Sequence, residues 1–314
     1  MLLNLDEERG ISVIVSTYSK EKKDQVLECI SSLKKQSFLP KEILLILDRD
    51  PELVEFFKDV VPADVEIVTS VGHGLSYARN AGVKHAKSEI VAFIDDDAVA
   101  DKDWLRNMSR NYSDSSVVGV GGLVAPSWDD GKTFWWFPEE LNWVIGCSYK
   151  GQSNRREAIR NPIGCNMSFR QSIFENVGYF RHDVGRFGKV LLDGEEPEFS
   201  IRVHQKFPEA KILNDPSAVV HHRVSPKRMS LKYVLKRAFY QGFSKALIYD
   251  SFGKESEILD LEHRYLNYLL TSSVKPRISR FYRLKNLVQL AVLFIASMLV
   301  FVGFAVGKVR EAVD

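Results

Sequence analysis

Three consecutive carboxylates, Asp95, Asp96 and Asp97, stand directly behind a short apolar run of the sequence. Neighbouring carboxylates repel one another, so they destabilise a fold unless a cation or hydrogen bonds compensate. A hard divalent ion fits this position, because Mg²⁺ is usually held by one or two carboxylates together with substrate phosphates. The alternative interpretation is a solvated acidic turn before a helix over residues 101–112.

Two further groups of side chains could take part in chemistry. Glu195, Glu196 and Glu198 lie in the segment GEEPEFSIR, where a carboxylate could act as a general base toward a hydroxyl. The residues alone favour a simpler role, in which these acids complement the positive end of a helix dipole. His221 and His222 end another apolar run, and they could bind a metal or form ordinary surface hydrogen bonds.

The segments around these residues follow the pattern of a layered α/β fold. Apolar runs rich in β-branched residues alternate with amphipathic stretches, which predicts a parallel sheet with helices on its faces. The predicted strands are 11–17, 42–47, 65–68 and 90–94, and the predicted helices are 21–35, 52–58, 76–86 and 101–112. Ligands of such sheets bind at the carboxyl ends of the strands. We therefore expect Thr17, Tyr18, Asp48 and the three aspartates at one edge of the sheet.

The order of four segments resembles that of the family 2 glycosyltransferases with the GT-A fold. These segments are ISVIVSTYS, the strand that ends before Asp48, GLSYARNAG and AFIDDDA. The resemblance covers roughly residues 10–223. It implies an α/β fold, GT-A, with a Rossmann-like mixed sheet flanked by helices.

The resemblance also implies roles for individual residues. The nucleotide sugar would be bound by Thr17, Tyr18, Asp48, Arg79, Asp95 and Asp96. The D-x-D motif at Asp95 and Asp97 would hold Mg²⁺ or Mn²⁺ together with His221, or with His222 as the alternate. Such an ion stabilises the charge that develops on the leaving diphosphate.

The second half of the chain would supply the base and the acceptor site. GEEPEFSIR resembles the family's G-E-D motif, which makes Glu196 the expected general base and Glu195 the alternate. NPIGCNMSFR resembles the segment beneath the acceptor sugar. The expected acceptor contacts are Trp136, Gly164, Asn166 and Arg223.

The net charge of +2 conceals two parts of opposite sign. Residues 1–222 contain 27 basic and 34 acidic side chains, which gives −7, whereas the remaining residues contain 16 and 7, which gives +9. A basic tail on an acidic body predicts an anionic partner for the tail. Nucleic acid is disfavoured as that partner, because the body is acidic and no recognised binding motif occurs.

The tail ends in the run LVQLAVLFIASMLVFVGFAV, residues 287–306, which has no charge. About twenty apolar residues suffice for a helix to cross a bilayer, so residues 287–307 are expected to be a transmembrane helix. A buried core helix is the alternative. More Lys and Arg precede the run than follow it, which predicts a single-pass protein of the cell membrane with its catalytic domain in the cytoplasm. The first ten residues do not resemble a signal peptide.

The region between the sheet and this run has basic and apolar residues at helical spacing. From Arg223 to Tyr249 there are seven basic and no acidic side chains, which predicts an amphipathic helix at a membrane interface. Packing on the catalytic domain is the alternative. The expected organisation is a catalytic domain over 1–223, an interfacial region over 224–286, the span over 287–307 and a tail over 308–314.

The loop over residues 132–150 is unusually aromatic and could fold into the core, cover the acceptor site or enter the bilayer. Its string WWFPEELNWVIGC resembles a subgroup of archaeal enzymes that extend lipid-linked glycans, including glucuronosyltransferases acting on glucosyl-dolichyl phosphate.

These features together favour an inverting, metal-dependent glycosyltransferase. It would use a nucleoside diphosphate sugar, expected to be a UDP-sugar such as UDP-glucuronate, and a hydroxyl of a polyprenyl-phosphate-linked saccharide as the acceptor. A synthase that transfers the sugar to the lipid phosphate itself is the main alternative. A nucleotidyltransferase and a non-catalytic membrane adaptor are the remaining ones.

Overall fold

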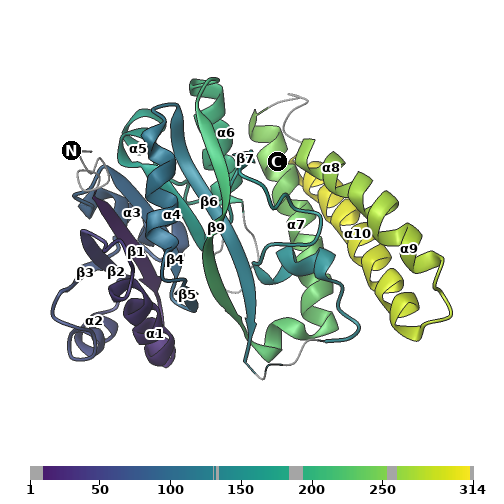
Figure 1. Cartoon of the computed structure of the whole chain (residues 1–314), viewed down its shortest axis with the longest axis horizontal. Helices are drawn as coiled ribbons and strands as arrows, with labels where there is room; N and C mark the ends of the chain where they lie inside the picture. Colours follow the sequence, from purple (N-terminus) through teal and green to yellow (C-terminus); the bar gives the residue numbers. More distant parts are fainter. Residues whose placement is uncertain (1–9, 130, 132–133, 184–193, 253–259, 312–314) are drawn as a thin grey trace. The chain divides into compact units, whose positions relative to one another are not determined.

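The computed structural model describes residues 10–129, 131, 134–183, 194–252 and 260–311 (Figure 1). The chain divides into two compact units. The first, here the sheet unit, comprises Met1–Ala125, Asn154–Gly188 and Glu195–His222. The second, here the helical unit, comprises Pro126–Ser153, Lys189–Gly194 and Arg223–Asp314.

A mixed sheet forms the centre of the sheet unit. Its strand order is β3-β2-β1-β4-β8-β6-β9-β5, and β7 pairs with β9. The strands are β1 (Ile11–Thr17), β2 (Glu42–Leu47), β3 (Val65–Thr69), β4 (Ile90–Asp95), β5 (Ala98–Ala100), β6 (Val117–Trp128), β7 (Glu157–Ala158), β8 (Asn166–Arg170) and β9 (Lys211–Val224). The first four in this order are parallel, whereas β8 runs antiparallel to β4. The predicted mixed sheet flanked by helices is confirmed.

Helices cover both faces of this sheet. They are α1 (Lys23–Lys34), α2 (Pro51–Lys58), α3 (Leu75–His85), α4 (Trp104–Ser109), α5 (Gln171–Val177) and α6 (Glu195–Lys206). Local sequence sets their ends: at α2, for example, Asp50 accepts hydrogen bonds from the backbone of Glu52 and Leu53, and Pro51 occupies the first turn, where a missing N–H costs nothing.

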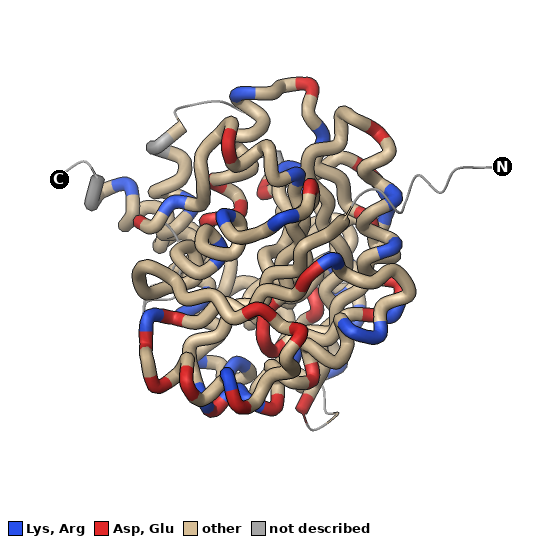
Figure 2. The backbone as a smooth tube through the Cα atoms, turned by 90° about the vertical axis from the view of Figure 1, so that its left-hand side faces the viewer, with Lys and Arg blue, Asp and Glu red and all other residues tan. Residues whose placement is uncertain are grey.

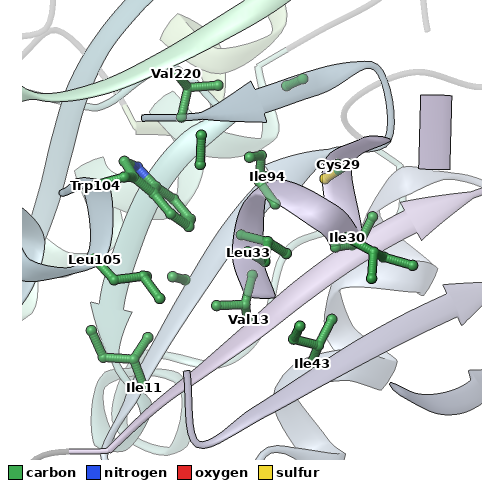
Figure 3. Packing of buried hydrophobic residues seen from close by; sticks show 14 of the residues in the cluster. Ile11, Val13, Cys29, Ile30, Leu33, Ile43, Ile94, Trp104, Leu105 and Val220 are labelled. Carbon is green, nitrogen blue, oxygen red and sulfur yellow. The ribbon is translucent and has the colours of Figure 1, made fainter. Parts of the chain in front are cut away.

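Alternate residues of β1 pack into two different cores, as expected of a strand buried on both faces. Val13 and Val15 join the core that contains α1, where Cys29, Ile30 and Leu33 are buried (Figure 3). Ile14 points to the other face and packs with α3 and α6. A Cβ on Gly82 of α3 would lie 2.7 Å from Ile14 Cγ2, so that helix can approach the strand closely only because this residue is glycine.

The acidic excess of residues 1–222 is a sum over the sequence, and it does not show where the charged residues lie in the fold. Acidic and basic positions are interspersed along the backbone seen in Figure 2. The carboxylates that matter for chemistry must therefore be identified by position.

The helical unit contains four α-helices among the residues described. They are α7 (Leu231–Phe252), α8 (Asp260–Tyr268), α9 (Lys275–Ile278) and α10 (Leu284–Glu311), with a π-helix over Leu269–Val274. The predicted basic helix corresponds to α7 and the predicted span to α10. Within Leu284–Val309 an 18-residue stretch of the latter has a mean hydropathy of 2.6, which by length and composition makes it the one described helix able to cross a membrane.

Candidate active site

The residues predicted at one edge of the sheet do lie behind adjacent parallel strands. Thr17 is in register with Leu47, the residue before Asp48, and Ser16 is in register with Asp95. The carboxyl ends of β1, β2 and β4 thus bring the expected nucleotide contacts to a common edge, the usual ligand position in such sheets.

Asp95, Asp97 and His222 form the cluster best suited to hold a metal ion. One ligand atom from each lies within 4.8 Å of the others, and His222 Nε2 is 3.3 Å from Asp97 Oδ1. The cluster exists because the short strand β5 folds back from the aspartates and pairs with β9, where Ala98 is opposite His222. Two carboxylates and one imidazole suit a hard or borderline divalent cation such as Mg²⁺ or Mn²⁺.

The two adjacent histidines have different environments, because successive side chains of a strand point to opposite faces. His222 is buried with 2% of its side chain exposed, and it faces the aspartates. His221, the expected first choice, is largely exposed, and its Nε2 lies 2.9 Å from Asp101 Oδ1. The geometry therefore brings the alternate histidine, not the first choice, to Asp95 and Asp97.

Asp96 is not part of this cluster and forms an ion pair with Lys22, a residue that no sequence motif indicated. Lys22 Nζ lies 2.5 Å from Asp96 Oδ1 and 3.6 Å from Asp97 Oδ2. Burial raises the pKa of Asp96 to about 6, although Lys22 acts in the opposite direction. Burial also lowers the pKa of Lys22, but Asp96 and Asp97 outweigh it and raise that pKa overall. The repulsion expected among three adjacent carboxylates is thus relieved partly by this lysine.

Arg79 connects the aspartates to the acidic pair on α6. Its Nη1 donates to Glu196 Oε1 at 2.8 Å and to Glu195 Oε1 at 3.3 Å, while Nη2 is 3.8 Å from Asp95 Oδ1. The side chain is 3% exposed. Burial lowers the pKa of Arg79, but Glu196 and Glu195 outweigh it and raise the pKa above its usual value. A buried guanidinium in contact with three carboxylates fixes their orientation.

The two candidate bases differ in their access to solvent. Glu195 and Glu196 both begin α6, but the side chain of Glu195 is 3% exposed and that of Glu196 is 13% exposed. Gly164 lies against Glu196: a Cβ at this glycine would be only 1.7 Å from Glu196 Oε1 and 2.5 Å from Arg79 Nη2. The segment expected beneath the acceptor thus makes room for the carboxylate of the expected base.

The expected base and ribose contacts line the same edge. Thr17 is buried, whereas Tyr18 is 67% exposed with Lys22 Nζ at 5.2 Å from its ring centroid. Asp48 is partly buried, and its Oδ2 lies 3.6 Å from His73 Nδ1. An exposed aromatic ring could stack on a base, and the carboxylate of Asp48 could accept hydrogen bonds from the nucleoside.

Asn166 occupies the core of the sheet unit. Its amide nitrogen donates to the backbone carbonyls of Leu123 and Ala218, and its amide oxygen accepts a hydrogen bond from Trp104 Nε1 at 2.8 Å. With no exposed surface, the side chain holds β6, β8 and β9 together. Its expected role in acceptor binding stays a prediction.

The other expected acceptor contacts, Trp136 and Arg223, belong to the helical unit. Trp136 packs edge-on against Phe134 and Phe137 in the aromatic loop. Arg223 Nε lies 3.1 Å from Asp129 Oδ1. Their contribution to an acceptor site also stays a prediction.

A buried polar network holds the aromatic loop within the helical unit. Glu140 has no exposed surface, and it accepts hydrogen bonds from Arg277 and Ser273 at 2.8 Å. Gln289 of α10 accepts a hydrogen bond from Arg277 Nε and donates one to the carbonyl of Trp135 at 2.9 Å. The one strongly polar residue of the apolar run is therefore a structural contact between that helix and the aromatic loop.

The sheet topology, the D-x-D cluster at the strand edge and the carboxylates at a helix start together define a glycosyltransferase of the GT-A fold. The family model for glycosyl transferase family 2 matches residues 12–178, and the chain belongs to this family.

Similar proteins agree with this assignment. The glucosyl-dolichyl phosphate glucuronosyltransferase of Haloferax volcanii is 31% identical over 95% of this chain and 96% of its own length. The succinoglycan biosynthesis protein ExoM of Rhizobium meliloti is 24% identical over 76% of this chain and 74% of its own. A solved mannosyltransferase of Pyrobaculum calidifontis, in complex with GDP-Man and Mn²⁺, has a TM-score of 0.61 at 18% identity and covers 97% of this chain and 88% of its own. That structure supports the fold.

Proposed function

We propose that this glycosyltransferase moves a sugar from a nucleoside diphosphate sugar to a hydroxyl of a saccharide linked to dolichyl or polyprenyl phosphate, with inversion at the anomeric carbon. The proposed donor is UDP-glucuronate, because the relative that matches nearly the whole chain is named as a glucuronosyltransferase acting on glucosyl-dolichyl phosphate. The observation that carries the proposal is the position of Arg79 between Asp95 and Glu196.

Glu196 is the proposed general base. It takes the proton of the acceptor hydroxyl while the oxygen attacks the anomeric carbon from the face opposite the leaving diphosphate. Arg79 is a positioning residue: its hydrogen bond at 2.8 Å holds the carboxylate of Glu196 in one orientation. Glu195 is more deeply buried, and its hydrogen bond to Arg79 supports the same orientation.

Asp95, Asp97 and His222 would hold Mg²⁺ or Mn²⁺, which neutralises negative charge on the diphosphate when bound. Thr17, Tyr18 and Asp48 would hold the nucleoside at the neighbouring strand ends. Lys22 compensates Asp96, which leaves the two flanking aspartates directed at the ion site.

We place the enzyme at the cell membrane with the sheet unit on the cytoplasmic side. The excess of Lys and Arg before residue 287 supports this side, since the cytoplasmic leaflet carries anionic lipids that attract basic segments next to a membrane. By length and composition, α10 could also cross the membrane once, as expected from the sequence.

Transfer assays with purified protein, Mn²⁺ and a panel of nucleotide sugars test the proposal. Glu196→Gln should lower kcat by roughly 10²–10⁴-fold if the acceptor is a hydroxyl, whereas the exposed control Glu209→Gln should be neutral. Near-normal transfer by Glu196→Gln would instead support a lipid phosphate acceptor, which is already ionised at neutral pH. Absence of transfer and of hydrolysis with every donor, with no effect of Asp97→Asn, would refute the assignment.

A further inference from the structure

The two sides of α10 have different surroundings, although both are largely apolar. Its inner side is buried within the helical unit and consists of Gln289, Val292, Leu293, Ala296, Gly303 and Gly307. Its outer side is exposed and consists of Leu287, Phe294, Ile295, Met298, Phe301, Val302, Val306 and Val309. Both sets recur at intervals of three and four residues, which places them on opposite faces of one helix.

The inner side is in direct backbone contact with α7. A Cβ at Gly242 would lie 1.9 Å from the carbonyl oxygen of Val300, and a Cβ at Gly303 would lie 2.0 Å from that of Phe239. Small residues allow two helices to approach this closely. A Cβ at Gly307 would lie 2.6 Å from Ala246 Cβ, and Lys308 Nζ lies 4.1 Å from the ring centroid of Tyr249. The later parts of both helices therefore meet, and the two helices run in the same direction.

This register places one charged residue of α7, Lys236, beside the middle of the apolar run. Lys236 precedes Gly242 by six residues, which is about 9 Å along a helix. It therefore lies level with the first half of residues 287–306, and it is exposed. Lys245, three residues beyond Gly242, is paired with Glu262 of α8 at 2.8 Å.

If α10 crossed a bilayer in this packing, it would carry α7 and these charges into the hydrocarbon layer. Charged side chains in that layer are costly and are normally directed to a polar interior or a water-filled cavity. Lys236 is exposed on the surface instead. This packing therefore makes a membrane-spanning position of α10 costly, although its length and composition would allow one.

We propose that α10 lies along the surface of an anionic membrane, with its outer side buried among the acyl chains and its inner side on α7. A helix in this position inserts about 5–10 Å into the boundary between headgroups and chains. This proposal rests on the membrane association given above, but not on the sugar-transfer chemistry.

The segment that leads into α10 supplies the charge complementarity for such a surface. Arg280, Arg283 and Lys285 are exposed, and Phe281 and Tyr282 between them are 67% and 71% exposed. Cations beside aromatic rings suit the level of anionic headgroups, where each basic residue adds to the binding free energy.

A depth profile on the full chain tests the orientation. Single cysteines that replace Leu287, Phe294, Phe301 and Val309 are labelled with an environment-sensitive fluorophore. The native cysteines are buried, so they should not react with it. The labelled proteins are then mixed with vesicles whose lipids carry bromine at defined depths, which quenches a fluorophore at the same depth. We expect all four positions to be quenched best by the same shallow lipid, and Asp64→Cys on the sheet unit to be unaffected. A profile that is deepest at Phe294 and Phe301 and shallow at both ends would show a span and overturn the proposal.

Sidedness gives an independent readout. In sealed membrane vesicles from expressing cells, an impermeant maleimide should label Asp314→Cys and Asp64→Cys from the same side. Labelling from opposite sides would show that α10 crosses the membrane.

Binding to added vesicles tests the charge and the outer side. Phosphatidylglycerol in phosphatidylcholine vesicles should tighten binding roughly tenfold or more, as expected for several cations at an anionic surface. Replacing Arg280, Arg283 and Lys285 by Gln should remove that gain, and Phe301→Asp should abolish binding without unfolding the protein. A dimer that forms through the outer side, together with no vesicle binding, would overturn the proposal. A protein that binds vesicles in this way but transfers no sugar would refute only the proposed function.

Discussion

Gly164→Ala is the substitution for which the structure predicts the sharpest functional loss. Its Cβ would lie 1.7 Å from Glu196 Oε1 and 2.5 Å from Arg79 Nη2, whereas ordinary contacts between such atoms begin near ~3.4 Å. Both neighbouring atoms end flexible side chains, so the protein can fold by moving the carboxylate. Glu196 must then shift by roughly 1.5–2 Å away from the acceptor segment.

A displacement of that size has a definite expected cost. About 1 Å of misplacement lowers a rate by about 10²-fold, which corresponds to roughly 2.7 kcal/mol in the activation barrier. We therefore expect Gly164→Ala to lower kcat at least 100-fold, with the affinity for Mn²⁺ little changed because the proposed ion ligands lie on β4, in the turn that follows it and on β9. Steady-state transfer kinetics measure the first quantity and calorimetric titration measures the second.

A double-mutant cycle with Glu196→Gln tests the reasoning behind this expectation. If Gly164→Ala acts by displacing Glu196, the double variant should be about as slow as the slower single variant, because contacting residues are not additive. Activity of Gly164→Ala within tenfold of the parent, or fully additive losses, would refute the assignment. A melting temperature near that of the parent is needed to confirm that the variant is folded.

Three further outcomes are expected. His222→Ala should weaken Mn²⁺ binding by roughly 10–100-fold or more, measured by titration calorimetry, and His221→Ala should not; equal effects would disprove the placement of His222 at the ion. Burial raises the pKa of Asp215, but hydrogen bonds from three side chains outweigh it and lower that pKa. The resulting stabilisation is complete above the unfolded pKa near ~3.9 and is lost as the pH falls through the lower folded value. Asp215→Asn should therefore lower the melting temperature at pH 7 and reduce its acid dependence, unlike the exposed control Asp59→Asn. Gly303→Leu should separate α10 from α7 and destabilise the helical unit by about 1–3 kcal/mol or more, seen as faster proteolysis there; unchanged resistance would contradict the close packing.

Local patterns were sufficient to predict the first half of the sheet. Three of the four parallel strands, β1, β2 and β4, contain an uninterrupted apolar or β-branched run, and β1, β2 and β3 are each followed by a helix, so strand ends could be located from the sequence. β5 could not be found in this way, because Ala98–Ala100 is too short to show a period. Its pairing with β9 is nevertheless what brings Asp97 to His222.

The choice between His221 and His222 illustrates why the site was only partly predictable. Both follow the same apolar run, and a shift of one residue in strand register exchanges their faces. The partners of Arg79 and Lys22 are also set by the fold, since charged residues show no local preference for a particular distant carboxylate. Glu196 could be proposed from its motif, but its contact with Gly164 could not.

The sequence also predicted only part of the structure of the C-terminal helices. Composition identifies residues 287–306 as apolar, but it does not distinguish a side that packs on protein from one that meets lipid. Gly242 and Gly303 appear unremarkable in the sequence, and only the helix pairing shows that they permit backbone contact. The expected interfacial helix is α7, yet much of its surface is buried in the structure.

The pairing of β5 with β9 also has a consequence for how the protein is made. Asp95 and Asp97 leave the ribosome long before His222, and the third proposed ligand reaches them only when the last strand of the sheet docks. Contacts between such distant segments form late and slowly in folding. Tight metal binding should therefore appear only in chains that have completed the sheet, and Mn²⁺ affinity can serve as a measure of how much of a preparation has reached the native state.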